Sequence, residues 1–251
     1  DPWLLINTIM GTAFVAAGVG ALNQYIERTS DGQMKRTIRR PIPSGRIKPS
    51  TARWFGIVLS AAGLIYLLST VSVPVAFVAF LTLVLYLIVY TPLKMKTTWN
   101  TLIGAIPGAL PPLGGWLAAS GNLETGGWIL FGILFLWQIP HFFAIAWLHR
   151  NDYGRIGFKM LPVVEPSMTK TSVYSVVFCA LLILCTTSLH LSGIAGQIFM
   201  WGSLLPGVTF LALAIDASRG WTEVRARRLL AGSIIYLPLL LVILVIDQSL
   251  L

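Results

Sequence analysis

Apolar runs close to 20 residues long recur along the whole chain, separated by short polar segments. A helix of about 20 apolar residues is long enough to cross the hydrocarbon core of a bilayer. The runs lack the polar–apolar alternation of membrane barrel strands, so the pattern predicts helices. The expected spans are 3–22, 52–70, 74–91, 100–119, 127–148, 171–191, 195–215 and 229–248. We therefore predict an all-α polytopic membrane bundle of eight transmembrane helices, folded as a single domain over 1–251.

Composition and charge agree with this interpretation. Hydrophobic residues make up 56% of the chain and charged residues 11%, against about 25% in soluble domains. All 18 Lys and Arg residues fall in four segments, which follow the first, third, fifth and seventh spans. These segments are 23–53, 94–96, 150–170 and 219–228. By the positive-inside rule they face the cytoplasm, or the matrix of a mitochondrion, and both termini lie outside.

The net charge of +9 is thus explained by topology in a lipid bilayer, and no nucleic-acid partner is predicted. A bacterial plasma membrane is favoured over a mitochondrial inner membrane.

Asn23, Glu27 and Asp31 are spaced i, i+4, i+8 after the first span, so on a continuing helix they share one face. Two carboxylates and a carboxamide suit Mg²⁺, which binds through a few carboxylates together with substrate phosphates. Arg36 and Arg40 follow in a loop rich in guanidinium groups, which match phosphate oxygens well. The spacing favours a magnesium–diphosphate site. The alternative is a solvated basic loop with incidental acids.

Lys94 and Lys96 end the third span at the same membrane face. They can reach a diphosphate as point charges. The alternative is that they only anchor the span at the interface, as many lysines do.

Gln138 and His141 lie inside the fifth span, where polar side chains are costly and face a cavity or a partner. His149, Asp152 and Tyr153 follow at its basic end and extend this polar stripe if the helix persists. The structural alternative for His141 is a hydrogen bond between helices. Two histidines without a nearby thiolate make a poor zinc site.

The segment from Asn23 to Asp31 resembles the first acidic motif of the UbiA-type intramembrane prenyltransferases, and the loop after it is also similar. Within that superfamily the chain resembles the haem-farnesylating branch, the protohaem IX farnesyltransferases, over essentially its whole length. Three stretches carry this likeness, namely 34–45, 90–116 and 137–164.

The resemblance implies a bundle of nine helices that joins the farnesyl group of farnesyl diphosphate to a vinyl group of haem b. Magnesium is the implied cofactor. The implied magnesium ligands and catalytic residues are Asn23, Glu27, Asp31 and Asp152. The implied diphosphate-binding residues are Arg36, Arg40, Lys94 and Lys96. The implied haem-binding residues are His141, Gln138 and His149.

Two departures from the family pattern stand out. The superfamily's second motif has a pair of Asp residues four apart, whereas His149 and Tyr153 occupy those places here and leave Asp152 as the local carboxylate. Eight spans instead of nine leave the first family helix without a counterpart.

An aromatic-ring prenyltransferase, acting for example on 4-hydroxybenzoate, is one alternative function. A membrane transporter is an alternative of another class, because transporters also contain broken helices and polar groups near the membrane midplane.

Overall fold

The computed structural model describes residues 1–250, which are almost entirely helical. Eight helical segments among these residues are long and apolar enough to cross a membrane. They are α1 (Pro2–Ile26), α3 (Pro49–Thr70), the continuous segment Val73–Leu93, α6 (Asn100–Ser120), α7 (Thr125–Leu148), α10 (Thr169–Leu191), α11 (Gln197–Ser218) and α12 (Glu223–Leu250). The predicted all-α polytopic bundle of eight spans is confirmed, and the protein is an integral membrane protein.

The third span is built from three consecutive pieces. They are α4 (Val73–Val84), the π-helical segment η1 (Leu85–Tyr90) and α5 (Thr91–Leu93). Pro92 has no backbone N–H, which disturbs the hydrogen-bond ladder at this point. The Thr91 hydroxyl lies 2.8 Å from the Tyr86 carbonyl oxygen, where it supplies a side-chain donor to that carbonyl. π-helical turns of this type are frequent at functional sites.

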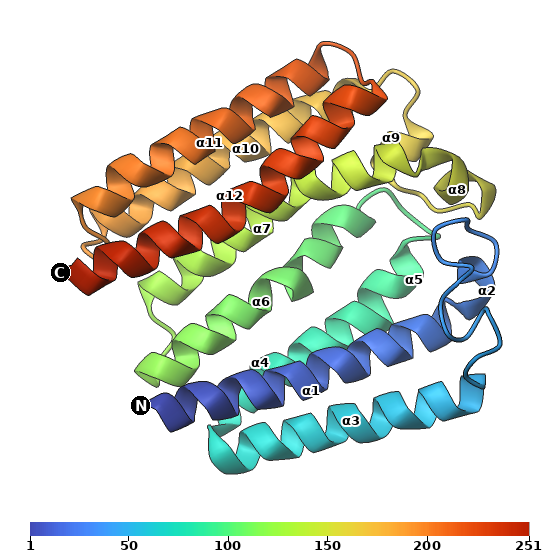
Figure 1. Ribbon diagram of the computed structural model, residues 1–251, viewed down its shortest axis with the longest axis horizontal. Coiled ribbons are helices and arrows are strands. Elements are labelled where there is room, and N and C mark those ends of the chain that lie inside the picture. The colour runs from blue at the N-terminus through green and yellow to red at the C-terminus, as the bar shows by residue number, and fades with distance from the viewer. Residues whose placement is uncertain (251) are drawn as a thin grey trace.

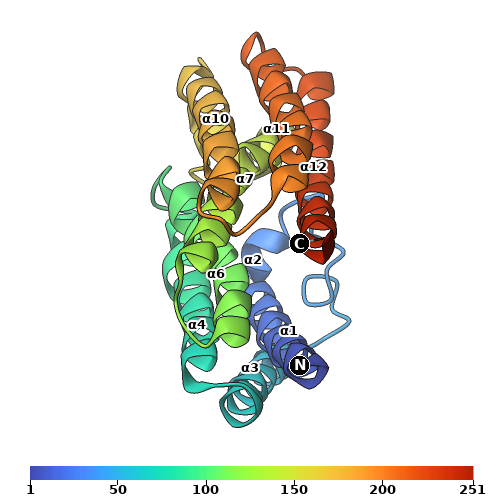
Figure 2. The same ribbon diagram turned by 90° about the vertical axis from the view of Figure 1, so that its left-hand side faces the viewer.

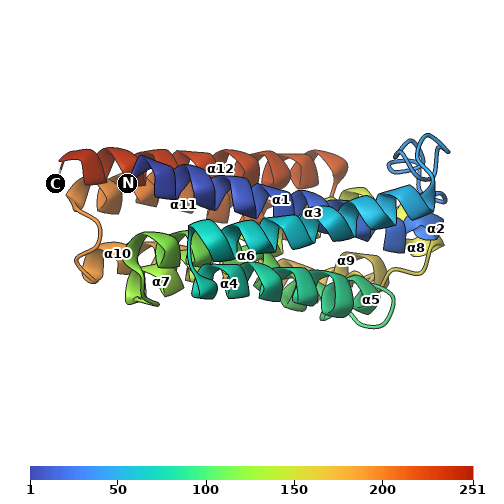
Figure 3. The same cartoon turned by 90° about the horizontal axis from the view of Figure 1, so that it is seen from below.

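The spans form two groups of neighbours in space. In the first group α1 packs on α3, and α4 packs on α6. In the second, α10 and α12 pack on α7, and α11 packs on α10 and α12. The two groups meet mainly through α6 and α7, which lie side by side (Figures 1 and 2). The helix axes run roughly along the long dimension of the molecule (Figure 3).

The four basic segments lie at one end of the bundle (Figure 1). This end also carries the short helices α2 (Arg28–Asp31), α8 (Arg150–Arg155) and α9 (Leu161–Val164). Both termini lie at the opposite end. The predicted alternation of the spans, with all four basic segments at one end and both termini at the other, is therefore confirmed.

Small residues allow α1 and α3 to approach closely. A Cβ added at Gly18 of α1 would lie 2.7 Å from the backbone nitrogen of Ser60, and one added at Gly63 of α3 would lie 2.8 Å from that of Val15. Small residues are enriched at membrane helix contacts because they let backbones come together. This packing fixes α1, whose last turn carries Asn23, the first residue of the predicted acidic motif. Glu27 caps the end of α1, and Asp31 follows in α2.

Candidate active site

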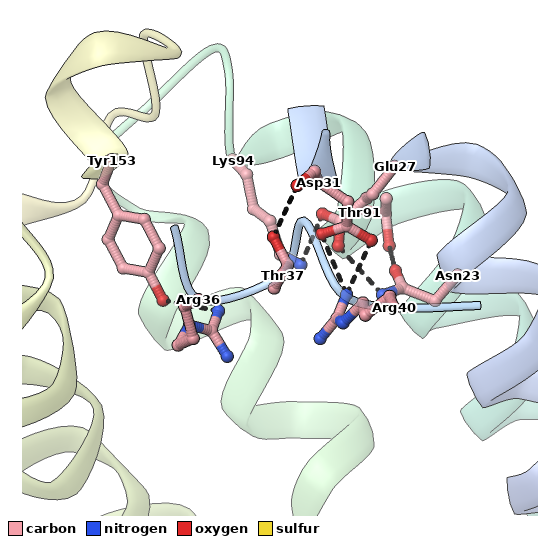
Figure 4. Close-up of polar contacts among 9 residues, drawn as sticks. All are labelled: Asn23, Glu27, Asp31, Arg36, Thr37, Arg40, Thr91, Lys94 and Tyr153. Carbon is pink, nitrogen blue, oxygen red and sulfur yellow. Dashed lines mark hydrogen bonds and ion pairs between the residues drawn. The ribbon is translucent and has the colours of Figure 1, made fainter. Parts of the chain in front are cut away.

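A polar cavity of about 230 Å³ opens at the basic end of the bundle, where α1, α2, η1 and α7 meet the loop after α2. Its charged and amide side chains are Asn23, Glu27, Asp31, Arg36, Arg40 and Lys94. Three tyrosines, Tyr86, Tyr90 and Tyr153, also line it. The structure thus brings six of the residues predicted for magnesium and diphosphate into one cavity (Figure 4).

Each carboxylate in the cavity has a basic partner. Lys94 Nζ lies 2.8 Å from Glu27 Oε1, and both side chains are only 10% exposed. Arg40 Nη1 donates to both oxygens of Asp31, at 2.8 and 2.9 Å. Asp31 is completely buried, whereas the Arg40 side chain is 31% exposed. A buried carboxylate needs such a partner, because an isolated buried charge is strongly unfavourable.

Asn23 links the acidic motif to the third span. Its amide nitrogen donates to Glu27 Oε2 at 2.9 Å, one helical turn further along. Its amide oxygen lies 3.0 Å from the hydroxyl of Thr91. Thr91 is a residue of the site that the sequence did not single out, because a threonine before a proline carries no functional signal by itself.

Arg36 has a different kind of partner. Its Nη2 donates to the Tyr153 hydroxyl at 3.2 Å, and its guanidinium carbon lies 5.9 Å from the centroid of the same ring. Among residues 1–250, no carboxylate lies within ion-pair distance of Arg36. The cavity therefore holds three cations and two carboxylates, which leaves it with one unbalanced positive charge (Figure 4).

A second cavity of about 440 Å³ adjoins the polar one and extends into the membrane region between α1, α4 and α6. Asn23, Arg40 and Tyr86 line both cavities, so the two are neighbours. The walls of the second cavity are mostly apolar, with Val15, Val19 and other small side chains. At the junction the Tyr86 and Tyr90 rings meet edge to face, 5.2 Å apart. The arrangement suits an apolar chain with an anionic head group.

Lys96 and Asp152 do not line the polar cavity. Lys96 is exposed in the loop before α6. The Asp152 carboxylate lies 3.8 Å from Arg155, and the next residue, Tyr153, faces the cavity in its place. The assignment of Lys96 to diphosphate and of Asp152 to magnesium gains no support from this geometry and stays a prediction.

His149 ends α7 beside the cavity, with its ring 6.2 Å from that of Tyr153. Partial burial lowers its pKa, and the nearby Arg36 guanidinium lowers it further, while Asp152 opposes the shift. His149 is therefore held in its neutral form near neutral pH.

His141 lies between α7 and α12. Its Nδ1 is 2.7 Å from Ser233 Oγ, and its ring stacks on Trp137 with centroids 4.8 Å apart. Ser233 donates its one proton to the Leu230 carbonyl oxygen at 2.6 Å. With its proton on that carbonyl, the hydroxyl accepts from His141 in the tautomer that carries its proton on Nδ1, and Nε2 then has the lone pair of the neutral ring. Ser233 is a second residue that the sequence did not single out.

Gln138 is buried and bridges helices. Its side-chain nitrogen donates to the Leu134 carbonyl at 2.9 Å and to the Ala105 carbonyl of α6 at 3.3 Å. A Cβ added at Gly108 would collide with the Gln138 side-chain oxygen. Gln138 therefore links α7 to α6 through a hydrogen bond and close packing, and its predicted haem contact remains a prediction.

The oxygen atoms of Asn23, Glu27 and Asp31 fit a magnesium ion in their chemistry, because hard oxygen ligands on one cavity wall are what this ion takes. No group of three His, Cys, Asp or Glu side chains within residues 1–250 is placed to hold a metal alone. Magnesium commonly completes its shell with water and substrate phosphates. The donor set therefore suits an ion that binds together with a diphosphate.

Comparisons with known proteins agree with this chemistry. The model of the UbiA prenyltransferase family matches residues 1–241. A protoheme IX farnesyltransferase of Salinibacter ruber is 47% identical, covering 98% of this chain and 87% of its own length. Another, of Solibacter usitatus, is 44% identical over 97% of this chain and 84% of its own.

The fold is also known from solved structures. One structure concerning digeranylgeranylglyceryl phosphate synthase superposes with a TM-score of 0.83 at 18% identity, over 100% of this chain and 88% of the other. At this identity the likeness shows the shared helical fold alone. The sequence matches, the fold and the acidic motif with its basic partners together show that this chain belongs to the UbiA prenyltransferase family.

Proposed function

We propose that this chain transfers the farnesyl group of farnesyl diphosphate to a vinyl group of haem b, with Mg²⁺ as cofactor, and so forms haem O. One observation carries the proposal, namely the polar cavity with its carboxylate–cation pairs beside an apolar cavity of about 440 Å³. The relatives named as protoheme IX farnesyltransferases support haem b as the acceptor.

The polar cavity binds the diphosphate. Asn23, Glu27 and Asp31 would hold the magnesium ion, which would supply positive charge to the departing diphosphate. Arg40 and Lys94 line the same cavity, where they donate to Asp31 and Glu27. From these positions they can also donate to diphosphate oxygens. Such fixed positive charge in a site shielded from water stabilises a leaving group strongly.

The apolar cavity holds the farnesyl chain, with its reactive carbon at the junction beside Tyr86. The carbon–oxygen bond to the diphosphate breaks, and its electron pair leaves with the diphosphate. The electron pair of the haem vinyl group forms the new carbon–carbon bond. The cation left next to the pyrrole is captured by water, which loses a proton and leaves a hydroxyethylfarnesyl group.

His141 supports haem binding. Its Nε2 lone pair is free and its ring is fixed by Ser233 and Trp137, as expected for a neutral imidazole that ligates haem iron. We assign His149 to haem binding as well, because it ends α7 beside the polar cavity.

The distribution of basic residues indicates how the protein is oriented in the membrane. The basic loops, and with them the polar cavity, are placed on the cytoplasmic or matrix side by the positive-inside rule. A soluble substrate with two phosphates then reaches the cavity from that side.

A competition assay tests the proposal. Full-length protein in detergent receives farnesyl diphosphate, Mg²⁺ and equal amounts of haem b and 4-hydroxybenzoate, and the products are separated by chromatography. We expect haem O to form and the prenylated benzoate not to form. Prenylation of the benzoate alone would favour the aromatic-ring alternative. Absence of both products, together with uptake of a solute into vesicles, would favour a transporter.

A further inference from the structure

Arg36 stands apart from the other two cations of the polar cavity. Lys94 and Arg40 are paired with carboxylates, at 2.8 Å in each case. Arg36 instead donates to a neutral phenol, the hydroxyl of Tyr153, at 3.2 Å. Arg36 thus carries the unbalanced charge of the cavity, and Tyr153 is the polar side chain that holds it (Figure 4).

We propose that Tyr153 is a positioning residue for the diphosphate, which orders the Arg36 guanidinium in the cavity without neutralising it. The inference rests on the proposed function, since it names a further determinant of the same diphosphate site. Tyr153 acts through Arg36 and is not assigned a catalytic contact of its own.

The chemistry of the pair explains why a phenol suits this place. A carboxylate would form an ion pair with Arg36 and cancel the charge that attracts the substrate. A phenol oxygen accepts a hydrogen bond but stays uncharged, and its ring also attracts the guanidinium, 5.9 Å away. Arg36 is exposed, and the phenol hydroxyl holds its guanidinium at the cavity without removing its charge.

Burial makes Tyr153 a rigid support. The residue is only 7% exposed, and its ring packs 5.6 Å from that of Phe158. A long arginine side chain loses rotamer freedom when it binds a ligand, so ordering it beforehand lowers that cost. Tyr153 comes from α8, which lies across the cavity from the acidic motif, so it fixes Arg36 on the opposite wall.

The test is a titration of inorganic diphosphate with Mg²⁺ into the full chain in detergent, followed by calorimetry. We expect Tyr153→Phe, which keeps the ring, to weaken binding by about five- to tenfold. Arg36→Gln should weaken it at least as much, and the double variant no further than Arg36→Gln alone. Tyr174→Phe, a tyrosine of α10 outside the cavity, serves as the matched control and should bind as the wild type does.

Three results would contradict this inference, and each has a different meaning. If the losses from Tyr153→Phe and Arg36→Gln multiply in the double variant, Tyr153 does not act through Arg36. Unchanged affinity in Tyr153→Phe, with a wild type that binds diphosphate, overturns this inference and leaves the proposed function standing. A wild type that does not bind diphosphate with Mg²⁺ overturns both.

A charge variant gives an independent check. Tyr153→Asp should bind diphosphate more weakly than Tyr153→Phe, because the new carboxylate neutralises Arg36. Tighter binding than in Tyr153→Phe would show that this place needs an acidic metal ligand and would contradict the inference. Where melting temperatures show that the Asp variant is misfolded, the comparison of the Phe and Gln variants decides the question.

Discussion

Asp31→Asn is the most informative single substitution, because its structural and catalytic effects can be estimated separately. Asp31 is fully buried and accepts two contacts from Arg40, whose side chain is 31% exposed. Breaking a buried ion pair costs about 3–5 kcal/mol. The Asn amide oxygen keeps one acceptor and Arg40 is partly solvated, so we expect a loss of about 2 kcal/mol. The melting temperature should then fall by about 4–8 °C.

The catalytic effect should be much larger. Removing one charged magnesium ligand should lower turnover by about a hundredfold or more, and most strongly at limiting Mg²⁺. Haem O formation, measured over a range of Mg²⁺ concentrations at a temperature where the variant is folded, checks this. Asp216→Asn is the control, because Asp216 pairs with Arg225 at 3.3 Å, outside the polar cavity. Near-normal activity of Asp31→Asn at limiting Mg²⁺ would refute the assignment of the acidic motif.

Three further predictions concern topology, haem and pH. Cysteines placed at Ser167 and Asn122 should be labelled from opposite sides of the membrane, Ser167 from the cytoplasm, and labelling from one side would overturn the span order. Ser233→Ala should weaken haem binding about tenfold and change the Soret band while leaving diphosphate affinity intact, because His141 loses the acceptor that orients it. If only the melting temperature falls, the role of His141 is to hydrogen-bond α7 to α12. The pKa of His149 is lowered by burial, so its contribution to stability is present above about pH 6.5 and lost as the pH falls. The melting temperature of the wild type should therefore drop more between pH 7 and pH 5 than that of His149→Gln, and equal drops would contradict the shift.

The fold was predictable because membrane insertion is decided by local composition. Eight apolar runs and four basic segments are sufficient to place every span and the order of the loops. The acidic motif was predictable for a similar reason, since the i, i+4, i+8 spacing of Asn23, Glu27 and Asp31 is a local property of one chain segment.

The rest of the site depends on contacts between distant segments. Thr91 meets Asn23 across 68 residues, Tyr153 meets Arg36 across 117, and Ser233 meets His141 across 92. No local pattern marks such pairs. The sequence also did not show that Tyr153, rather than Asp152, lines the polar cavity, because one residue on a helix turns a side chain by about 100°.

Diphosphate should leave from the polar cavity during farnesyl transfer to haem b. The most direct measurement is the amount of diphosphate released and of haem O formed by the wild type, with and without Mg²⁺, and by Glu27→Gln. We predict equal molar amounts of the two products with the wild type and Mg²⁺, and neither product without Mg²⁺ or with Glu27→Gln. Haem O formed at the wild-type rate by Glu27→Gln, or without any divalent cation, would show that the magnesium–diphosphate site in this cavity is not used.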